Sequence, residues 1–311
     1  MPQIRKPGEH YKDLPKPDEY YEDMVQSPAD YFGEHSQDLK IGKTTAGDKM
    51  YLPLKALSTH VHIIGATRTG KSYFMEALLR DIITRGYGAC LIDPHEQLYQ
   101  NMVNFLAAFP ELAEKVILFD PSPKGEKYVG FNPLRRTNIF PEISTQVRYI
   151  TSGVAKVWEE DSKNTPLLRR NMGNMLYPLI EGGYTLREAE AFIDLYDTSK
   201  RSVLVQSTSR RRVLNDWYAF DKMSQTKKME LLGSLQNRMP DFLDSKAILY
   251  TLGRIKNVLD IEDIVENRKI LLCNFSSCKN WLSDDDAYLL GVLLVNEMTN
   301  YAKSCRTREM G

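Results

Sequence analysis

One short segment, residues 65–72, constrains the fold of this chain more than any other. Its letters, GATRTGKS, satisfy the pattern G-x-x-x-x-G-K-[ST], in which glycines let successive backbone N–H groups point at one phosphate. The apolar run at 61–64 predicts a strand before it, and the amphipathic stretch at 73–85 predicts a helix after it. A phosphate-binding loop requires this order of strand, loop and helix, so the context supports the motif.

The loop predicts a nucleotide site in which each residue type has a role. The Lys71 ammonium would reach the β- and γ-phosphates, and the Ser72 hydroxyl would ligate Mg²⁺. The helix that begins near Lys71 would add the positive end of its dipole to the same place. Arg68 would either touch phosphate or face solvent. The expected cofactors are therefore ATP and Mg²⁺, and the expected contact residues are Gly65, Ala66, Thr67, Arg68, Thr69, Gly70, Lys71, Ser72 and Tyr73.

The fold class predicted by the apolar pattern is α/β, with a mainly parallel sheet. Continuous apolar runs at 89–92, 116–119 and 270–275 are typical of strands that are buried on both faces. Helical patterns at 97–109 and 283–304 lie between or after them, as the crossover connections of a parallel sheet require. A turn at Ala46-Gly47-Asp48 predicts a β-hairpin ahead of the phosphate-binding loop.

The chain divides into four predicted segments. Residues 1–37 form an N-terminal arm, rich in proline and tyrosine, that either docks on a protein surface or stays a partly disordered tail. Residues 38–135 form a core that carries the loop, and 263–311 return to that core. Residues 136–262 have no comparable strand signal and predict an all-helical insertion. The helical signals are apolar spacing at Val147, Ile150, Val154 and Val157, the pair Thr165-Pro166, and a capping box from Thr185 to Glu188.

Composition and the N-terminal sequence indicate the compartment in which the protein works. Lys plus Arg and Asp plus Glu number 41 each, so bulk charge does not draw the chain to nucleic acid or to anionic lipid. The 4 cysteines have neither disulfide-framework nor zinc spacing, which indicates reduced thiols. The N-terminus is unlike a signal peptide, and no apolar run is long enough to span a bilayer. We expect a cytoplasmic protein.

Two acids near the end of a predicted strand are candidates for catalysis. Asp93 ends the run at 89–92, and Glu96 follows it closely, so the pair would serve as metal holder and as base for the attacking water. Asp-Pro also occurs at ordinary strand exits, here at both Asp93-Pro94 and Asp120-Pro121. Spacing alone leaves both interpretations open.

A basic segment at 198–229 is the candidate for nucleic acid. Arg210, Arg211 and Arg212 would contact phosphates, with Trp217 and Tyr218 nearby to stack on bases. The alternative is a solvated helix face whose cations pair with acids elsewhere. Arg169-Arg170 is a candidate for an arginine that acts on a neighbouring site, although its spacing does not single it out.

Several motifs together resemble the HerA/FtsK superfamily of P-loop motors, most of all the conjugative-transfer coupling ATPases of the TraG/TraD group and their HerA-like relatives. The motifs are HIIGATRTGKS from His62, LIDPH from Leu91, FDP from Phe119, GFNPL from Gly130, KILLCNF from Lys269 and SDDDAYLLG from Ser283. The resemblance implies a RecA-like core with a helical insertion, hexameric rings, ATP-driven movement of duplex DNA or a transferred strand, and work at the cytoplasmic face of a membrane complex.

The resemblance also places the family's acidic pair, Asp-Glu, on a strand beyond the part similar to 270–275. No apolar run followed by Asp-Glu occurs after Phe275, so the chain is expected to stop before that strand. Three functions stay open: a DNA-translocating motor, a nucleotide-binding module that hydrolyses ATP poorly and acts through a partner, and a kinase-like enzyme with a small substrate. A partner protein would be contacted by the N-terminal arm.

Overall fold

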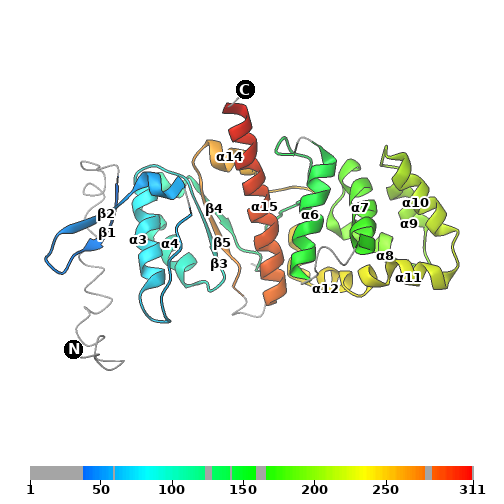
Figure 1. Ribbon diagram of the computed structural model, residues 1–311, viewed down its shortest axis with the longest axis horizontal. Coiled ribbons are helices and arrows are strands. Elements are labelled where there is room, and N and C mark those ends of the chain that lie inside the picture. The colour runs from blue at the N-terminus through cyan, green and yellow to red at the C-terminus, as the bar shows by residue number, and fades with distance from the viewer. Residues whose placement is uncertain are drawn as a thin grey trace. The chain divides into compact units, whose positions relative to one another are not determined.

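The computed structural model describes residues 38–58, 60–122, 128–140, 142–158, 166–276 and 282–309. The arm predicted at 1–37 lies outside the described residues. The chain falls into two compact units, Met1–Tyr87 and Gly88–Gly311. We call them the first and the second unit and describe each by itself (Figure 1).

The described part of the first unit contains a hairpin, a short 3-10 helix and one long helix. Strands β1 (Asp38–Lys43) and β2 (Lys49–Pro53) pair antiparallel, which confirms the predicted hairpin. Helix η2 (Leu54–Ser58) follows β2, and helix α3 (Lys71–Thr84) follows the glycine-rich loop. Arg85, just past α3, donates from Nη2 to the backbone oxygen of Asp38 at 3.0 Å and so attaches the helix to β1.

The strand predicted at 61–64 is absent, and that prediction was wrong. These residues have no strand assignment, and the side chains of Val61 and Ile64 are 45% and 82% exposed. The physical reason is the lack of a pairing partner. Among the described residues, β1 pairs with β2, and the other paired strands belong to the second unit. An apolar run becomes a strand only where another strand satisfies its backbone groups.

The second unit contains a parallel sheet of three strands, as predicted for an α/β protein with a RecA-like core. Strands β3 (Ala89–Asp93), β5 (Ile270–Asn274) and β4 (Val116–Phe119) lie in the order β3-β5-β4. All five residues of β5 are buried, which explains its unbroken apolar sequence. Helix α4 (Gln97–Ala107) packs on β3 and β5, and the short α5 (Pro110–Ala113) leads into β4.

The described residues between β4 and β5 form helices and loops only. The capping box at Thr185 is confirmed, because the Glu188 carboxylate accepts from the Thr185 backbone N–H at 2.8 Å. Of the predicted cap Thr165-Pro166, Thr165 lies outside the described residues, and Pro166 begins a helix. The helices are α6 (Ile143–Val157), α7 (Pro166–Glu181), η3 (Leu186–Ala189), α8 (Glu190–Ile193), α9 (Ser199–Val205), α10 (Arg211–Asp221), α11 (Gln225–Gln236), α12 (Met239–Asp244), α13 (Lys246–Leu252) and α14 (Ile261–Glu266).

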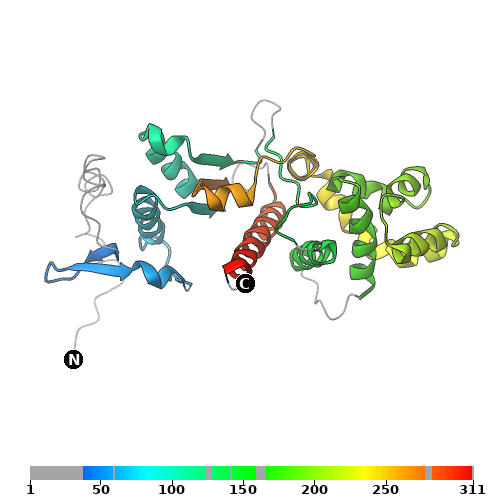
Figure 2. The same cartoon turned by 90° about the horizontal axis from the view of Figure 1, so that it is seen from above.

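The last helix, α15 (Asp284–Glu309), joins the sheet to this helical region. Its first turn is capped by Ser283, whose Oγ accepts from the backbone N–H of Asp286 at 3.0 Å, as predicted. It runs beside α6 in both ribbon views (Figures 1 and 2). Gly291 of α15 lies against Phe275, so the helix packs close to the end of β5.

A buried acid on α15 predicts a pH-dependent stability. The Glu297 side chain is 6% exposed, and burial raises the pKa of its carboxyl to about 7, with the Arg135 charge opposing the shift and Asp260 adding to it. The folded protein therefore holds a proton that the unfolded chain releases near pH 4.5. The contribution of Glu297 to stability is fully present below the unfolded pKa and is lost as the pH rises through the folded pKa.

We expect Glu297→Gln to match the wild type in free energy of unfolding at pH 4 and to exceed it increasingly from about pH 5 to pH 8. The amide keeps the shape of the protonated carboxyl but has no charge to bury. Urea unfolding of both proteins across this range measures the difference. A constant difference over the whole range would contradict the predicted titration.

Candidate nucleotide-binding site

The glycine-rich loop of the first unit is closed on itself by Lys71. Its Nζ donates to the backbone oxygens of Gly65 at 2.7 Å and Ala66 at 2.8 Å. The Thr69 hydroxyl also donates to the Ala66 oxygen, at 2.7 Å. A lysine ammonium has three N–H donors, so these two bonds leave capacity for one phosphate oxygen.

Two glycines are required by the shape of this loop. A Cβ on Gly65 would lie 2.5 Å from Thr69 Oγ1, so a larger residue would force the loop to open. Gly70 has a φ of +88°, in the left-handed region that glycine adopts without strain. Arg68 also lies in that region, with a φ of +66°. Left-handed residues next to helical ones turn successive N–H groups to one side, which is the geometry of an anion-binding nest.

Helix α3 presents an N-terminus without a side-chain cap. Gly70 is the N-cap residue and has no side chain with which to cap the first turn. The first N–H groups of a helix and its positive dipole end favour an anion. A curled glycine loop, a lysine at its mouth and an uncapped helix together fit a nucleotide phosphate chain, and the exposed Ser72 in the first turn supplies an oxygen of the kind that Mg²⁺ binds.

The predicted contact residues of the loop are brought together on one segment. Thr67, Arg68 and Ser72 are exposed, and Tyr73 is 49% exposed beside them. The exposed Arg68 side chain has no ion pair among the residues that the structure describes. Because their side chains are exposed, Thr67, Ser72 and Tyr73 are accessible to a nucleotide.

Asp93, in the second unit, has both carboxylate oxygens in use. Oδ1 accepts from the backbone N–H of His95 at 2.9 Å, and Oδ2 accepts from that of Tyr99 at 2.8 Å. The side chain is buried, at 5% exposure. These are the contacts of a strand-exit turn that also holds the start of α4. A catalytic role for Asp93 stays a prediction, and these two bonds leave one acceptor site on each oxygen.

Glu96 and Asp120 both lie close enough to Tyr99 for their charges to act on it. Burial, together with the charges of Asp120, Cys273 and Glu96, raises the pKa of Tyr99 to about 12. Glu96 itself has a φ of +68° and is the N-cap residue of α4. Its role as a base also stays a prediction.

Sequence reasoning missed Asn274, the last residue of the central strand. Its Nδ2 donates to Asp120 Oδ2 at 3.4 Å, and it lies opposite Asp93 in the register of β3 and β5. Polar side chains at the carboxyl ends of parallel strands are the usual position for ligand contacts in such sheets. The signal was present, because Asn274 is the first polar residue after an apolar run of four.

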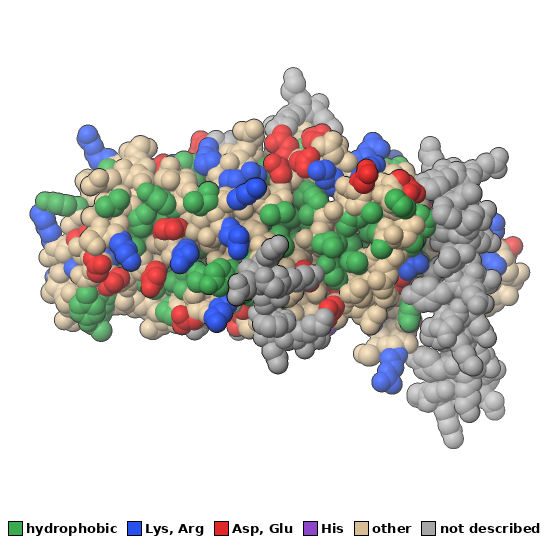
Figure 3. All heavy atoms as spheres, turned by 180° about the vertical axis from the view of Figure 1, so that it is seen from behind, with side chains coloured by type: hydrophobic (Ala, Val, Ile, Leu, Met, Phe, Trp, Pro, Cys, Tyr) green, Lys and Arg blue, Asp and Glu red, His purple; other side chains and the backbone are tan. Residues whose placement is uncertain are grey.

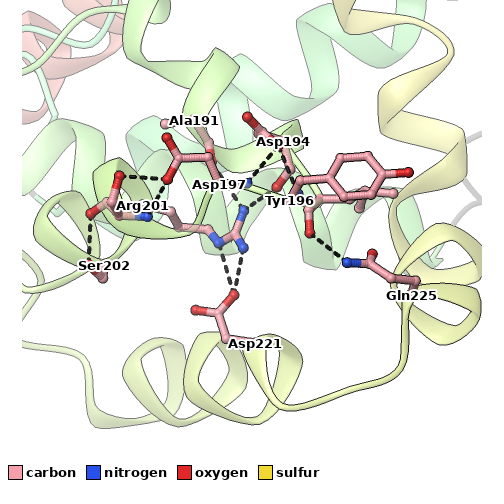
Figure 4. A network of polar contacts seen from close by, with 10 residues as sticks. Ala191, Asp194, Tyr196, Asp197, Arg201, Ser202, Asp221 and Gln225 are labelled. Atoms are coloured by element: carbon pink, nitrogen blue, oxygen red, sulfur yellow. Dashed lines mark hydrogen bonds and ion pairs between the residues drawn. The ribbon is translucent and has the colours of Figure 1, made fainter.

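One cation of the basic segment, Arg201, is bound inside the protein (Figure 4). Arg201 is fully buried and donates to the backbone oxygens of Ala191 at 3.1 Å and Asp194 at 2.6 Å. Its Nε also donates to Asp221 Oδ1 at 3.2 Å. The guanidinium carbon lies 5.4 Å from the ring centre of Trp217. This cation therefore stabilises the insertion and is closed to a ligand.

The expected stacking of a base on Trp217 is wrong. Trp217 is 4% exposed, and its Nε1 donates to the backbone oxygen of Asn174 at 3.0 Å. Its amphipathic ring is better satisfied in the core, where both the apolar body and the N–H find partners. Tyr218 is exposed, but Lys222 covers its ring at 3.9 Å from the centroid.

The three consecutive arginines differ in their surroundings. Arg210 lies over the Tyr177 ring at 4.2 Å and pairs with Glu181 at 3.5 Å, whereas Arg211 and Arg212 are exposed. Their contact with nucleic acid stays a prediction. Arg170, the other candidate cation, pairs with Asp216 at 2.8 Å.

The remaining features of the described residues concern metal ligands, thiols and apolar helices. It contains no group of three His, Cys, Asp or Glu residues placed to hold a metal ion. Cys90, Cys273 and Cys305 are free thiols, and burial raises the pKa of Cys273 well above its usual value. No described helix has both the length and the apolar character needed to span a bilayer.

We expect Gly65→Ala to weaken nucleotide binding about 5- to 100-fold, because overpacking of about 1–3 kcal/mol would disfavour the closed loop. Titration with a fluorescent ATP analogue measures this. Adding Thr69→Ala should recover part of the loss by removing the hydroxyl that the new Cβ would meet. The matched control is Gly233→Ala, because a Cβ added at Gly233 would meet open space. Wild-type affinity for Gly65→Ala would contradict the loop geometry.

We expect Arg201→Ala to lower the free energy of unfolding by about 3 kcal/mol, because Asp221 and two backbone oxygens lose a buried donor. The same change at exposed Arg211 should stay within about 0.5 kcal/mol. Urea unfolding followed by tryptophan fluorescence distinguishes the two. Equal losses would mean that Arg201 is not the buried anchor of this region.

Comparison with known proteins identifies the family. The family model for the central domain of helicase HerA matches residues 39–269, which is most of the chain and includes the glycine-rich loop and the helical region. No curated protein matches the chain. The chain therefore belongs to the HerA central-domain family, within the HerA/FtsK superfamily of P-loop ATPases.

Proposed function

We propose that this protein binds ATP with Mg²⁺ at residues 65–72 and couples ATP hydrolysis to the movement of DNA. The observation that carries the proposal is the closed loop at the N-terminus of α3, with the Lys71 ammonium bound to the oxygens of Gly65 and Ala66. Membership of the HerA family supports DNA as the object of the movement.

The chain's own residues have separable tasks in this proposal. The N–H groups of the loop and of the first turn of α3 bind the phosphates, and Lys71 holds positive charge beside them. Ser72 follows Lys71 in the sequence, and its Oγ would bind Mg²⁺. The ion, when bound, would neutralise phosphate charge. A loop that positions the phosphates in this way favours attack on the terminal phosphoryl group.

The proposed assembly is a homo-oligomeric ring around DNA, a hexamer if the core is complete. The resemblance to conjugative coupling ATPases supports DNA transfer, type IV secretion and the cytoplasmic face of a membrane complex as the setting. The N-terminal arm is the proposed contact for a partner protein. The ring and its setting are supported by family likeness, and the role of the arm is supported by its tyrosine-rich sequence.

A second candidate is a regulatory nucleotide-binding module that hydrolyses ATP poorly. The observation that favours it is the state of Asp93, whose two oxygens are both occupied by backbone donors. An acid that holds a turn in this way is less available for a metal or for the attacking water. Turnover, rather than binding, separates the two candidates.

We expect ATP hydrolysis that duplex DNA stimulates and that Lys71→Ala abolishes. The variant should also bind ATP about 10- to 100-fold more weakly, because a hydrogen bond to a charged group contributes about 1.5–3 kcal/mol. Phosphate release with and without DNA measures turnover. Lys43→Ala, an exposed lysine on the hairpin of the same unit, is the control.

Three outcomes are informative. Stimulated turnover lost only in Lys71→Ala supports the motor. Nucleotide binding without turnover, with or without DNA, supports the regulatory module. Failure of the wild type to bind ATP at all would overturn both.

A further inference from the structure

Two segments of the second unit, 128–131 and 250–258, form a rigid surface that the nucleotide site does not use. Phe131 donates its N–H to the Thr251 oxygen at 2.8 Å, and Val258 donates to the Gly130 oxygen at 2.9 Å. Gly130 permits this close approach, because a Cβ there would lie 2.5 Å from the Lys256 oxygen. The loop after α13 is therefore held in one position against the preceding segment.

Stacked tyrosines lie at one end of this surface. The rings of Tyr128 and Tyr250 are 4.7 Å apart at their centroids, with 22° between their planes. Tyr250 is 42% exposed, whereas tyrosines in folded proteins are on average more buried. Stacking against Tyr128 fixes the orientation of the Tyr250 ring while leaving part of it open to solvent. A fixed, exposed ring is a suitable platform for a nucleobase.

Basic residues outnumber acidic ones in the segments that carry the two tyrosines, and one of the basic residues, Arg135, pairs with Asp260 at 3.5 Å. The segments 128–140 and 245–259 contain five Lys and Arg residues and no Asp or Glu, in a chain with equal numbers of both signs. On the face drawn in the space-filling view, charges of both signs occur with hydrophobic side chains between them (Figure 3). The five cations are Arg135, Arg136, Lys246, Arg254 and Lys256.

The cations nearest to Tyr250 are available to a ligand. Arg254 is exposed, and its Nε donates to the backbone oxygen of Tyr250 at 3.2 Å, which attaches the guanidinium to the end of α13. Lys256 is exposed two residues further on, and Arg187 is exposed with its Cβ next to Gly253. Within the described residues, none of these three forms an ion pair. We call Tyr128, Arg187, Tyr250, Arg254 and Lys256 the Tyr250 surface.

We propose that the Tyr250 surface binds single-stranded nucleic acid, with phosphates on Arg254 and Lys256 and a base stacked on Tyr250. Free cations beside an exposed aromatic ring are the combination by which proteins hold unpaired strands. This inference rests on the proposed function, because it names the surface that contacts the DNA and the form of DNA that it contacts. It also differs from the contact predicted at Arg210–Arg212, where Trp217 is buried and Arg210 is paired.

An acidic polypeptide is the competing ligand, because it would satisfy the same cations. The exposed, fixed ring of Tyr250 favours the nucleic acid, since carboxylates gain nothing from an aromatic face. Duplex DNA would engage the cations, but its bases are already stacked and have no free face for Tyr250.

The test is fluorescence anisotropy of a labelled oligothymidine and of a labelled duplex with the full chain. We expect Tyr250→Ser to weaken oligothymidine binding about tenfold, and Tyr250→Phe to bind like the wild type. The double variant Arg254→Ala/Lys256→Ala should weaken binding and reduce the slope of log affinity against log salt by about 0.7 for each lost phosphate contact. The matched control, Arg148→Ala/Lys156→Ala, removes the same charge from exposed positions of α6.

The outcomes separate this inference from the proposed function. Failure of the wild-type protein to bind either the oligothymidine or the duplex would overturn the proposed motor. DNA binding that is equally weakened by the control, or is unchanged in the Tyr250 surface variants, would overturn only the inference. Equal loss on duplex and single strand in Tyr250→Ser would contradict the stacking. Polyglutamate that competes with oligothymidine as well as unlabelled oligothymidine does would identify an acidic polypeptide as the ligand and overturn the inference as well. Unchanged circular dichroism of each variant shows that it is folded.

Discussion

The pairing of β5 with two strands from a distant part of the chain is the constraint on which the second unit depends. Among the described strands, β3 and β4 are not paired with each other, and each pairs with β5. The Asn274 side chain reaches Asp120 across 154 positions of sequence. The sheet therefore forms only when the chain returns after the whole helical region, and the entropy of closing so long a loop has to be offset by burial of the central strand on both faces.

The helices and the sheet share one continuous core for the same reason. Phe119 at the end of β4 lies edge-on to Phe131 at 5.9 Å and to Phe275 at 5.3 Å, so three segments meet at one aromatic cluster. Buried residues of β5, α15 and the insertion belong to the same cluster of apolar side chains. The insertion is thus packed onto the sheet, and its stability is tied to the strand that follows it.

The parts of the fold that could be predicted are those encoded by local patterns. Unbroken apolar runs predicted β3, β4 and β5, and helical spacing at Val147 and Ile150 predicted α6. The hairpin and the capping box at Thr185 followed from turn and cap chemistry that depends on a few neighbouring residues. The loop at 65–72 was predicted as a motif, and its curled backbone follows from glycine at two positions. In each case the deciding interaction lies within a few residues in sequence.

The parts that could not be predicted depend on distant partners. The run at 61–64 is as apolar as the true strands, and only the lack of a partner strand separates it from them. Arg201 and Trp217 have a charge and a ring that suggest a surface role, but distant carbonyls and Asp221 satisfy them in the interior. The sequence left both a catalytic acid and a strand-exit turn open for Asp93, and only the folded chain places the N–H groups of His95 and Tyr99 on its oxygens. The order of the strands, and with it the meeting of Asp120 and Asn274, is set by tertiary packing.

The central claim is that a backbone loop closed by Lys71 recognises the phosphates of a nucleotide. Calorimetric titration of the protein with ATP, ADP and AMP in the presence of Mg²⁺ tests it most directly. The account predicts one site per chain, with ATP and ADP bound far more tightly than AMP, because the loop and the lysine contact the β- and γ-phosphates. Equal affinity for all three nucleotides, or binding that persists unchanged in Lys71→Ala, would contradict it.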